Sequence, residues 1–383
     1  MIGVLDLPVE LLIRIVQLLG WELKVYSDKE RQTDLTRLAH VNRAFKLIAD
    51  TLLYGGTVNV SSAGRTFLLA CTLKTNETLA ALVHTLVAKS VIDNGHPASL
   101  LQILQLTHLT SATLASVFFT KNQASFEMYS ALQAQRRLES FAYGFHGVDT
   151  PLAPITPLLQ SWPGLTSLTL DRVAPFDRGL DSLKRHAEVR GWGSPPSYKL
   201  KSLEISNCRS IDTVGWPLKA FKWLLGATDG LTSLTLVGFD AAFDLRELFA
   251  LLAEQGCTSS LERLNIRNFS GDADLDLDEP RFDPSSLSTL FPSLSFISLA
   301  NDDGETCFLP PKPFLHLPPS VRILELHEDL FLDWHVLRTV EEGPPASFRK
   351  IKLVGPFPTD PDVRALRTAC EERGLLLEVE RTF

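Results

Sequence analysis

The residues whose spacing is most suggestive of chemistry are four aspartates that alternate with other residues in the segment GDADLDLDEP. They are Asp272, Asp274, Asp276 and Asp278. Alternating carboxylates are typical of calcium-binding loops, in which side-chain oxygens from every second residue bind the ion. An EF-hand loop opening at Asp272, however, would place Leu277 where the sharp turn needs glycine and Asp283 where a bidentate glutamate is expected. We therefore interpret the segment as a solvated acidic insertion.

Other motifs of metal binding or catalysis are not found in the sequence. His327 and His335 are eight residues apart with Glu328 between them, a spacing that no common metal site requires. There is no G-x-S-x-G, P-loop, H-E-x-x-H or G-x-G-x-x-G motif. The five cysteines are scattered and never form a C-x-x-C pair, which favours reduced thiols over zinc sites or disulfides. We predict a protein that is not an enzyme and needs no cofactor or metal.

Most of the chain is organised by a short aliphatic pattern, L-x-x-L-x-L, that returns every 27 to 35 residues. Two of the nine copies are the identical hexapeptide LTSLTL. The copies begin at Leu109, Leu138, Leu165, Leu200, Leu231, Leu261, Leu294, Val321 and Phe348. Weaker copies lie around Val58, Leu86 and Leu377. The regular spacing predicts one supersecondary unit repeated along the chain.

Each copy is expected to form a short strand whose aliphatic residues point inward while the alternating residues face solvent. Helix patterns lie between the copies, for example at residues 245–256 and 362–374, and both of these segments end in glycine. A strand and a helix of about 30 residues cannot bury their apolar faces alone. We therefore predict an α/β fold in which neighbouring units stack into a curved solenoid, with parallel strands on the concave side and helices on the convex side.

These repeats resemble the leucine-rich-repeat family, specifically its longer members with a helix in each repeat. The best match is LKSLEISNCRSI, in which Cys208 and Ile211 take the family's Asn/Cys and Leu positions. Other repeats have bulky apolar residues at the Asn/Cys position, among them Val173, Phe239 and Phe269. We therefore expect irregular repeats with an incomplete internal ladder of side chains.

Residues at the third, fifth and seventh positions of each repeat are predicted to face outward. In the earlier repeats they are mostly small, as at Ser111, Ser140 and Ser167, but from Leu261 onward they are large. The predicted substrate contacts on the C-terminal concave face are Arg263, Asn265, Arg267, Phe296, Ile323, Glu325, His327, Lys350 and Lys352. Arginine and aromatic side chains dominate binding hot spots, and arginine pairs well with oxyanions. The expected ligand is an unidentified protein segment with acidic or phosphorylated groups beside an apolar residue; alternatively, these charges only keep the sheet soluble.

Residues 1–54 have a helical pattern instead of the repeat. Pro8 suits a first helical turn, Gly20 a helix end, and Asp34 can cap a second helix. The first helix has two adjacent apolar stripes, and a hairpin of this size is too small to bury both. Leaving four large side chains exposed would lose roughly 6 to 12 kcal/mol of the favourable free energy of burial. A partner protein or the end of the solenoid must therefore cover them.

The same segment resembles the F-box motif, with a Leu-Pro pair opening the first helix and a Val-x-Arg-x-aromatic signature in the second. The predicted adaptor-binding residues are Leu7, Pro8, Leu11, Ile15, Leu35, Leu38, Val41 and Phe45. Two departures from the motif are a long linker between the helices and Phe45 in place of the more common tryptophan. The resemblance implies binding to a Skp-type adaptor and, through it, to a cullin ligase. The alternative is that these helices only cap the first repeat.

Length and charge narrow the class of protein. The 383 residues provide enough apolar material for a large domain, and the net charge of −8 disfavours general nucleic-acid binding. No apolar run is long enough to span a membrane, and no basic cluster precedes the first helix as in a secretory signal. We predict an F-box at residues 1–54 and a leucine-rich-repeat solenoid at residues 55–383, in the cytoplasm or nucleus. The chain would be a ubiquitin-ligase substrate receptor; a repeat scaffold outside any ligase, for example a regulator of a small GTPase, is the alternative.

Overall fold

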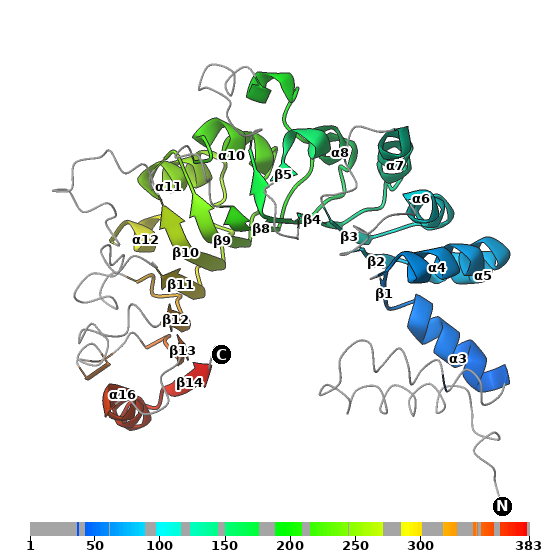
Figure 1. Cartoon of the computed structure of the whole chain (residues 1–383). Coiled ribbons are helices and arrows are strands. Elements are labelled where there is room, and N and C mark those ends of the chain that lie inside the picture. The colour runs from blue at the N-terminus through cyan, green and yellow to red at the C-terminus, as the bar shows by residue number, and fades with distance from the viewer. Residues whose placement is uncertain are drawn as a thin grey trace, which may run out of the picture. The chain divides into compact units, whose positions relative to one another are not determined.

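The architecture was determined from a computed structural model of the chain (Figure 1). The residues that the structure describes are 37, 43–60, 62–88, 97–115, 123–144, 150–175, 188–208, 215–243, 245–270, 285–300, 317–327, 340–341, 343, 346–355 and 361–380. They divide into two compact units, Met1–Phe141 and Ala142–Phe383, whose boundary falls within strand β4 (Ser140–Gly144). The boundary that the sequence predicts after residue 54 stays a prediction.

The first unit alternates helices with short strands (Figure 1). Its elements before β4 are α3 (Arg43–Tyr54), β1 (Thr57–Asn59), α4 (Ala63–Thr75), α5 (Glu77–Leu82), β2 (Thr85–Ala88), α6 (Pro97–Leu106), β3 (Ser111–Ala115) and α7 (Gln123–Gln133). Strand β2 pairs in parallel with both β1 and β3. Figure 1 shows helices α4 to α7 on one side of these strands.

The second unit continues the alternation with a longer series of strands. Its first elements are β5 (Thr150–Pro151), η3 (Ala153–Ile155), α8 (Thr156–Ser161), β6 (Ser167–Asp171), β7 (Val173–Ala174), β8 (Ser202–Cys208), α10 (Leu218–Leu225) and β9 (Ser233–Asp240). They are followed by α11 (Leu245–Glu254), β10 (Arg263–Ser270), α12 (Ser285–Leu290), β11 (Phe296–Ala300), β12 (Ile323–His327), β13 (Lys350–Val354), α16 (Pro361–Glu372) and β14 (Leu376–Glu380). Helices α10 and α11 lie on one side of these strands, and the opposite side is the open face (Figure 1).

Apart from β5 and β7, which pair with each other in a separate two-stranded sheet, consecutive strands of the series are hydrogen-bonded neighbours in one sheet. Among the described residues this sheet has 12 strands in the order β1-β2-β3-β4-β6-β8-β9-β10-β11-β12-β13-β14. The register keeps equivalent residues of successive repeats opposite one another; for example, Leu264 of β10 lies between Leu234 of β9 and Ile297 of β11. The α/β class, the parallel strands and all twelve predicted strand positions are therefore confirmed.

A recurrent backbone contact explains why the repeats stack in register. The carbonyl oxygen of the second residue in one copy accepts hydrogen bonds from two successive N–H groups in the next copy. Thr110 O accepts from Glu139 N at 2.8 Å and from Ser140 N at 3.0 Å, and the same contact recurs from Lys201 O to Thr232 N and Ser233 N. The first residue of each copy is buried in the core; these residues are Leu109, Leu138, Leu165, Leu200, Leu231, Leu261, Leu294, Val321 and Phe348.

The two predicted inter-strand helices are also confirmed. Helix α11 buries Leu245, Leu248 and Leu252 along one face, and the chain leaves it through Gly256, whose φ of 73° suits glycine. Helix α16 ends in the same way, with Gly374 at a φ of 68°. These exits turn the chain back toward the sheet, which is how each helix returns to the next strand.

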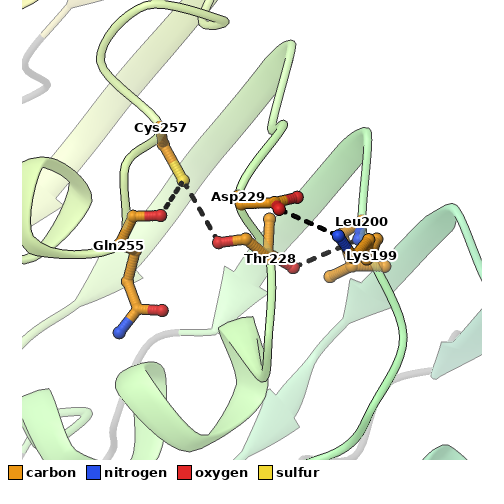
Figure 2. Close-up of polar contacts among 6 residues, drawn as sticks. All are labelled: Lys199, Leu200, Thr228, Asp229, Gln255 and Cys257. Atoms are coloured by element: carbon orange, nitrogen blue, oxygen red, sulfur yellow. Dashed lines mark hydrogen bonds and ion pairs between the residues drawn. The ribbon is translucent and has the colours of Figure 1, made fainter.

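Side-chain hydrogen bonds inside the turns add a partial ladder, of which Figure 2 shows one section. Thr228 Oγ1 accepts a hydrogen bond from Leu200 N at 3.1 Å, and Cys257 Sγ donates to Thr228 O at 3.7 Å. Cys208 Sγ accepts from Val173 N at 3.3 Å. Different residue types thus satisfy the backbone in different repeats, in keeping with the irregularity that the sequence predicts.

Candidate functional site

The predicted substrate contacts lie on strands β10 to β13, and the register places most of them in two rows across the open face. One row contains Arg263, Phe296, Ile323 and Lys350. The second contains Asn265, Ser298, Glu325 and Lys352. Arg267 lies one step further along β10, opposite Ala300. His327 is in β12, but its side chain is outside the described part of the structure. The fold therefore brings residues from four repeats onto one continuous surface.

Arg263 is the exposed cation of this surface, and Phe296 supports it. The guanidinium Cζ lies 4.2 Å from the centroid of the Phe296 ring. Phe296 is only 8% exposed, so it acts as a platform and not as a protruding anchor. A stacked guanidinium of this kind is stabilised by about 0.5 to 1 kcal/mol at an exposed site. Within the described residues no carboxylate pairs with Arg263, whose charge is thus available to a ligand.

Lys352, by contrast, is engaged by carboxylates on both neighbouring strands. Its Nζ lies 3.0 Å from Glu325 Oε2 on β12 and 2.5 Å from Glu380 Oε2 on β14. Glu325 is only 7% exposed, and its other oxygen accepts a hydrogen bond from Ser298 Oγ at 3.1 Å. The hydrogen bond to Glu380, with the contribution of Glu325, raises the pKa of the Lys352 ammonium. Lys352 therefore ties three strands together.

Lys350, two residues before Lys352 on β13, forms a similar ion pair with strand β14. Its ammonium pairs with Glu378 of β14, and this hydrogen bond lowers the pKa of the Glu378 carboxyl. Both lysines of the predicted site are thus neutralised within the sheet. Arg263 on β10 is the cation of the predicted site that pairs with no carboxylate of the described residues.

Asn265 adds an unmet hydrogen-bond acceptor beside Arg263 on the same strand. Its Oδ1 is buried and accepts no hydrogen bond from the described residues. Buried polar atoms are nearly always paired in native proteins, so such an acceptor favours an external donor. The side chain lies in the second row, two residues from Arg263 and opposite Ser298. A guanidinium donor and an amide acceptor at this spacing suit an extended peptide that also presents an acidic group.

Sequence reasoning missed three polar residues of this surface, namely Ser298, Glu378 and Glu380. Applying the third-and-fifth-position rule to the last weak copy would have found Glu378, because β14 pairs with β13 in the same register. Carboxylates opposite lysines would then have predicted neutralised lysines. Ser298 carries no such signal, since a small residue between large ones reveals nothing about hydrogen bonding.

The predicted adaptor-binding residues fall almost wholly outside the described part of the chain. Those outside it are Leu7, Pro8, Leu11, Ile15, Leu35, Leu38 and Val41. Phe45 lies in α3, although nothing is described of its side chain. Farther along α3, Ile48 and Ala49 are buried and Leu47 is exposed. The end of the second predicted helical segment is therefore confirmed as helix.

The acidic insertion, with Asp272, Asp274, Asp276 and Asp278, also lies outside the described residues, as does His335. Among the residues that are described, no group of three or more His, Cys, Asp or Glu side chains is placed to hold a metal ion. A search of the same residues finds no helix long and apolar enough to cross a membrane.

No protein-family model matches the chain, and no curated protein is significantly similar to it.

Proposed function

We propose that this chain is the substrate-recognition adaptor of a Skp-cullin-F-box ubiquitin ligase. In this proposal residues 1–54 are the F-box and residues 55–383 form a leucine-rich-repeat domain that binds a protein substrate. The observation that carries the proposal is a Leu-Pro helical motif followed by a long series of parallel strand-and-helix repeats. Repeats of this kind present a broad, rigid face to other proteins, whereas a separate segment is free to bind a scaffold. Such a ligase acts in the cytoplasm or nucleus.

Docking of the Skp-type adaptor is assigned to the apolar stripes of the N-terminal segment. Replacing Leu11 by aspartate puts a charge into that surface, and burying an unpaired charge is strongly unfavourable. We expect Leu11→Asp to abolish co-purification of the adaptor and to leave the circular dichroism and melting temperature of the repeats unchanged. Asp6→Asn, a change at a polar position of the same segment, serves as the control.

The outcome distinguishes the two candidate functions. Failure of the wild-type chain to retain a Skp-type adaptor from its own cell extract would contradict the ligase proposal. A repeat scaffold outside any ligase, for example a regulator of a small GTPase, would then be the better description.

Substrate capture is assigned to Arg263 and Asn265 on the open face. Among the described residues, no carboxylate pairs with the Arg263 guanidinium and no donor reaches Asn265 Oδ1. The lysines of the same face are neutralised by Glu325, Glu378 and Glu380, so they contribute to the stability of the sheet. The substrate class that fits is an extended segment with an acidic or phosphorylated group next to a backbone donor.

We expect Arg263→Gln to remove a specific set of proteins from those that co-purify with the chain, without loss of the adaptor. The reason is that a charge-assisted hydrogen bond to the substrate disappears while the apolar docking surface is untouched. Quantitative mass spectrometry of the complexes measures both effects. Arg322→Gln is the matched control, because Arg322 is an exposed arginine just before β12. Equal losses in the two variants, or losses only with Thr169→Arg on β6, would place the substrate elsewhere.

A further inference from the structure

A cavity in the first unit has features of a second binding site, formed by residues other than those of the open face. It has a volume of about 200 Å³ and is lined by His108, Ala134, Gln135, Arg136 and Arg137. His108 follows helix α6, and the other four residues form the turn that follows α7. The cavity is partly open to solvent, so a group on another molecule can enter it.

The turn that carries the two arginines is held by a buried glutamine. Gln135 is 5% exposed, and its Oε1 accepts a hydrogen bond from Leu109 N at 2.8 Å. Its Nε2 donates to Leu104 O at 2.7 Å and to Thr107 O at 3.2 Å. The Gln135 backbone also accepts from Leu138 N at 3.1 Å. The backbone beneath Arg136 and Arg137 is thus fixed before any ligand arrives, which lowers the entropic penalty of binding.

Arg136 and Arg137 have no carboxylate partner within the part of the chain that is described. Both are exposed, and neither takes part in an ion pair there. Glu139, two residues beyond Arg137, is the nearest carboxylate in the sequence but does not line the cavity. The His108 imidazole adds a further hydrogen-bonding group to the wall, and the His108 carbonyl lies 3.3 Å from His84 Nδ1. Two adjacent arginines, neither of them paired with a carboxylate of the described residues, therefore line a preformed cavity.

We propose that this cavity binds the phosphate group of a phosphorylated side chain on a partner protein. A phosphate monoester carries a charge of about −1.5 to −2 at pH 7 and three acceptor oxygens, which matches two guanidinium forks better than a single carboxylate does. Liquid water occupies about 30 Å³ per molecule, so the cavity holds a group several waters in size. It is smaller than the roughly 300 to 1,000 Å³ of typical cofactor and drug pockets.

The net charge of the chain and the small number of basic residues in the cavity disfavour the two other common sources of phosphate. Nucleic acids are bound by extended rows of basic residues that neutralise many phosphates, and the chain has a net charge of −8. Recognition of an anionic membrane surface needs clusters of about four to eight basic residues. One arginine pair in a small hollow suits a single phosphate instead. The inference holds whether or not the chain joins a ligase, because it rests on the cavity alone.

The test is isothermal titration calorimetry of the full chain with short peptides in a low-salt buffer. The probes are acetyl-Ala-phosphoserine-Ala-amide and the same peptide with unmodified serine. We expect binding of the phosphopeptide only, weakened at least tenfold in the double variant Arg136→Gln, Arg137→Gln. Arg65→Gln is the control, since it removes one charge from an exposed position on α4 of the same unit. Melting curves confirm that all variants are folded.

Three results would overturn the proposal. The first is equal phosphopeptide affinity of the double variant and the wild-type chain, and the second is equal binding of the serine and phosphoserine peptides. The third is arginine-dependent binding of a single-stranded RNA 10-mer or of phosphatidylserine vesicles without binding of the phosphopeptide. Binding in these experiments is independent of any adaptor, so failure here leaves the adaptor test unaffected.

Discussion

At the scale of single residues, Gln135 shows how one buried side chain can hold a loop in place. A buried amide is unfavourable unless its donors and acceptor are paired. The Nε2 group of Gln135 donates to the carbonyl oxygens of Leu104 and Thr107, and its Oε1 accepts from Leu109 N. The contact spans 26 to 31 residues of sequence, from one repeat to the next. It therefore links the stacking of the repeats to the geometry of the arginine cavity.

We expect Gln135→Leu to lower the free energy of unfolding by about 3 kcal/mol. The substitution leaves one backbone N–H and two carbonyl groups in the interior without this partner, and each such group costs about 1 to 3 kcal/mol, offset in part by relaxation. Urea denaturation followed by circular dichroism measures the change. Gln133→Leu is the matched control, because Gln133 is exposed at the end of α7. A similar loss in both variants would show that the hydrogen bonds of Gln135 do not cause it.

At the scale of elements, strands β12, β13 and β14 are joined by side chains as well as by their backbones. Lys352 lies between a buried carboxylate on one side and an exposed one on the other. Because β14 ends the strand order, these contacts help to hold the last strand on the sheet. The backbone of an edge strand is otherwise open to pairing on one side.

We expect Lys352→Met to destabilise the protein by about 1 to 3 kcal/mol, since the buried carboxylate of Glu325 would lose its ammonium partner. Thermal denaturation of the variant and the wild type measures the effect. Lys199→Met is the control: it breaks the ion pair between Lys199 and Asp229, whose side chains are both largely exposed, and little change is expected. Similar melting temperatures for the wild type and Lys352→Met would contradict the role assigned to Lys352.

The ion pairs of Lys352 with Glu325 and Glu380 also predict that the stability of the protein depends on pH. The pKa of Lys352 is raised in the folded state, so its contribution to stability is complete below the ordinary lysine range and is lost as the pH rises through the raised value. The difference in unfolding free energy between the wild type and Lys352→Met should therefore shrink at strongly alkaline pH. Denaturation series at neutral and alkaline pH measure this difference.

At the scale of the whole molecule, stability is spread along a series of repeats that contact mainly their neighbours. Leu236 is fully buried in β9, between Ile205 of β8 and Ile266 of β10. We expect Leu236→Ala to destabilise the second unit by about 2 to 5 kcal/mol. Amide hydrogen exchange should show the largest loss of protection in β8, β9 and β10, and a smaller loss in β2 of the first unit.

Leu376→Ala provides the comparison for this prediction, because Leu376 is 59% exposed on β14. The same atoms are removed there with little loss of burial, so protection should change little. A uniform loss of protection over both units in Leu236→Ala would instead indicate that the chain unfolds as one cooperative body.

The positions of the strands and of the helices between them could be predicted from the sequence. The alternation of Leu168 and Leu170 with Ser167 and Thr169 is a local pattern, and its return at a constant spacing indicates parallel stacking. Glycines such as Gly256 mark helix ends for a similarly local reason, because few other residues adopt their backbone angles. The two-residue period of the strand pattern also identified which side chains face away from the core.

Only the tertiary structure decided which of those residues remain available to a partner. Arg263 and Lys352 are both large, outward-facing cations in the sequence, yet one lies over an aromatic ring and the other is neutralised by two glutamates. The arginine cavity depends in the same way on Gln135 reaching the preceding repeat. Each difference arises from contacts between residues about 26 to 33 positions apart, which are set by the register of neighbouring repeats and therefore leave no local pattern in the sequence.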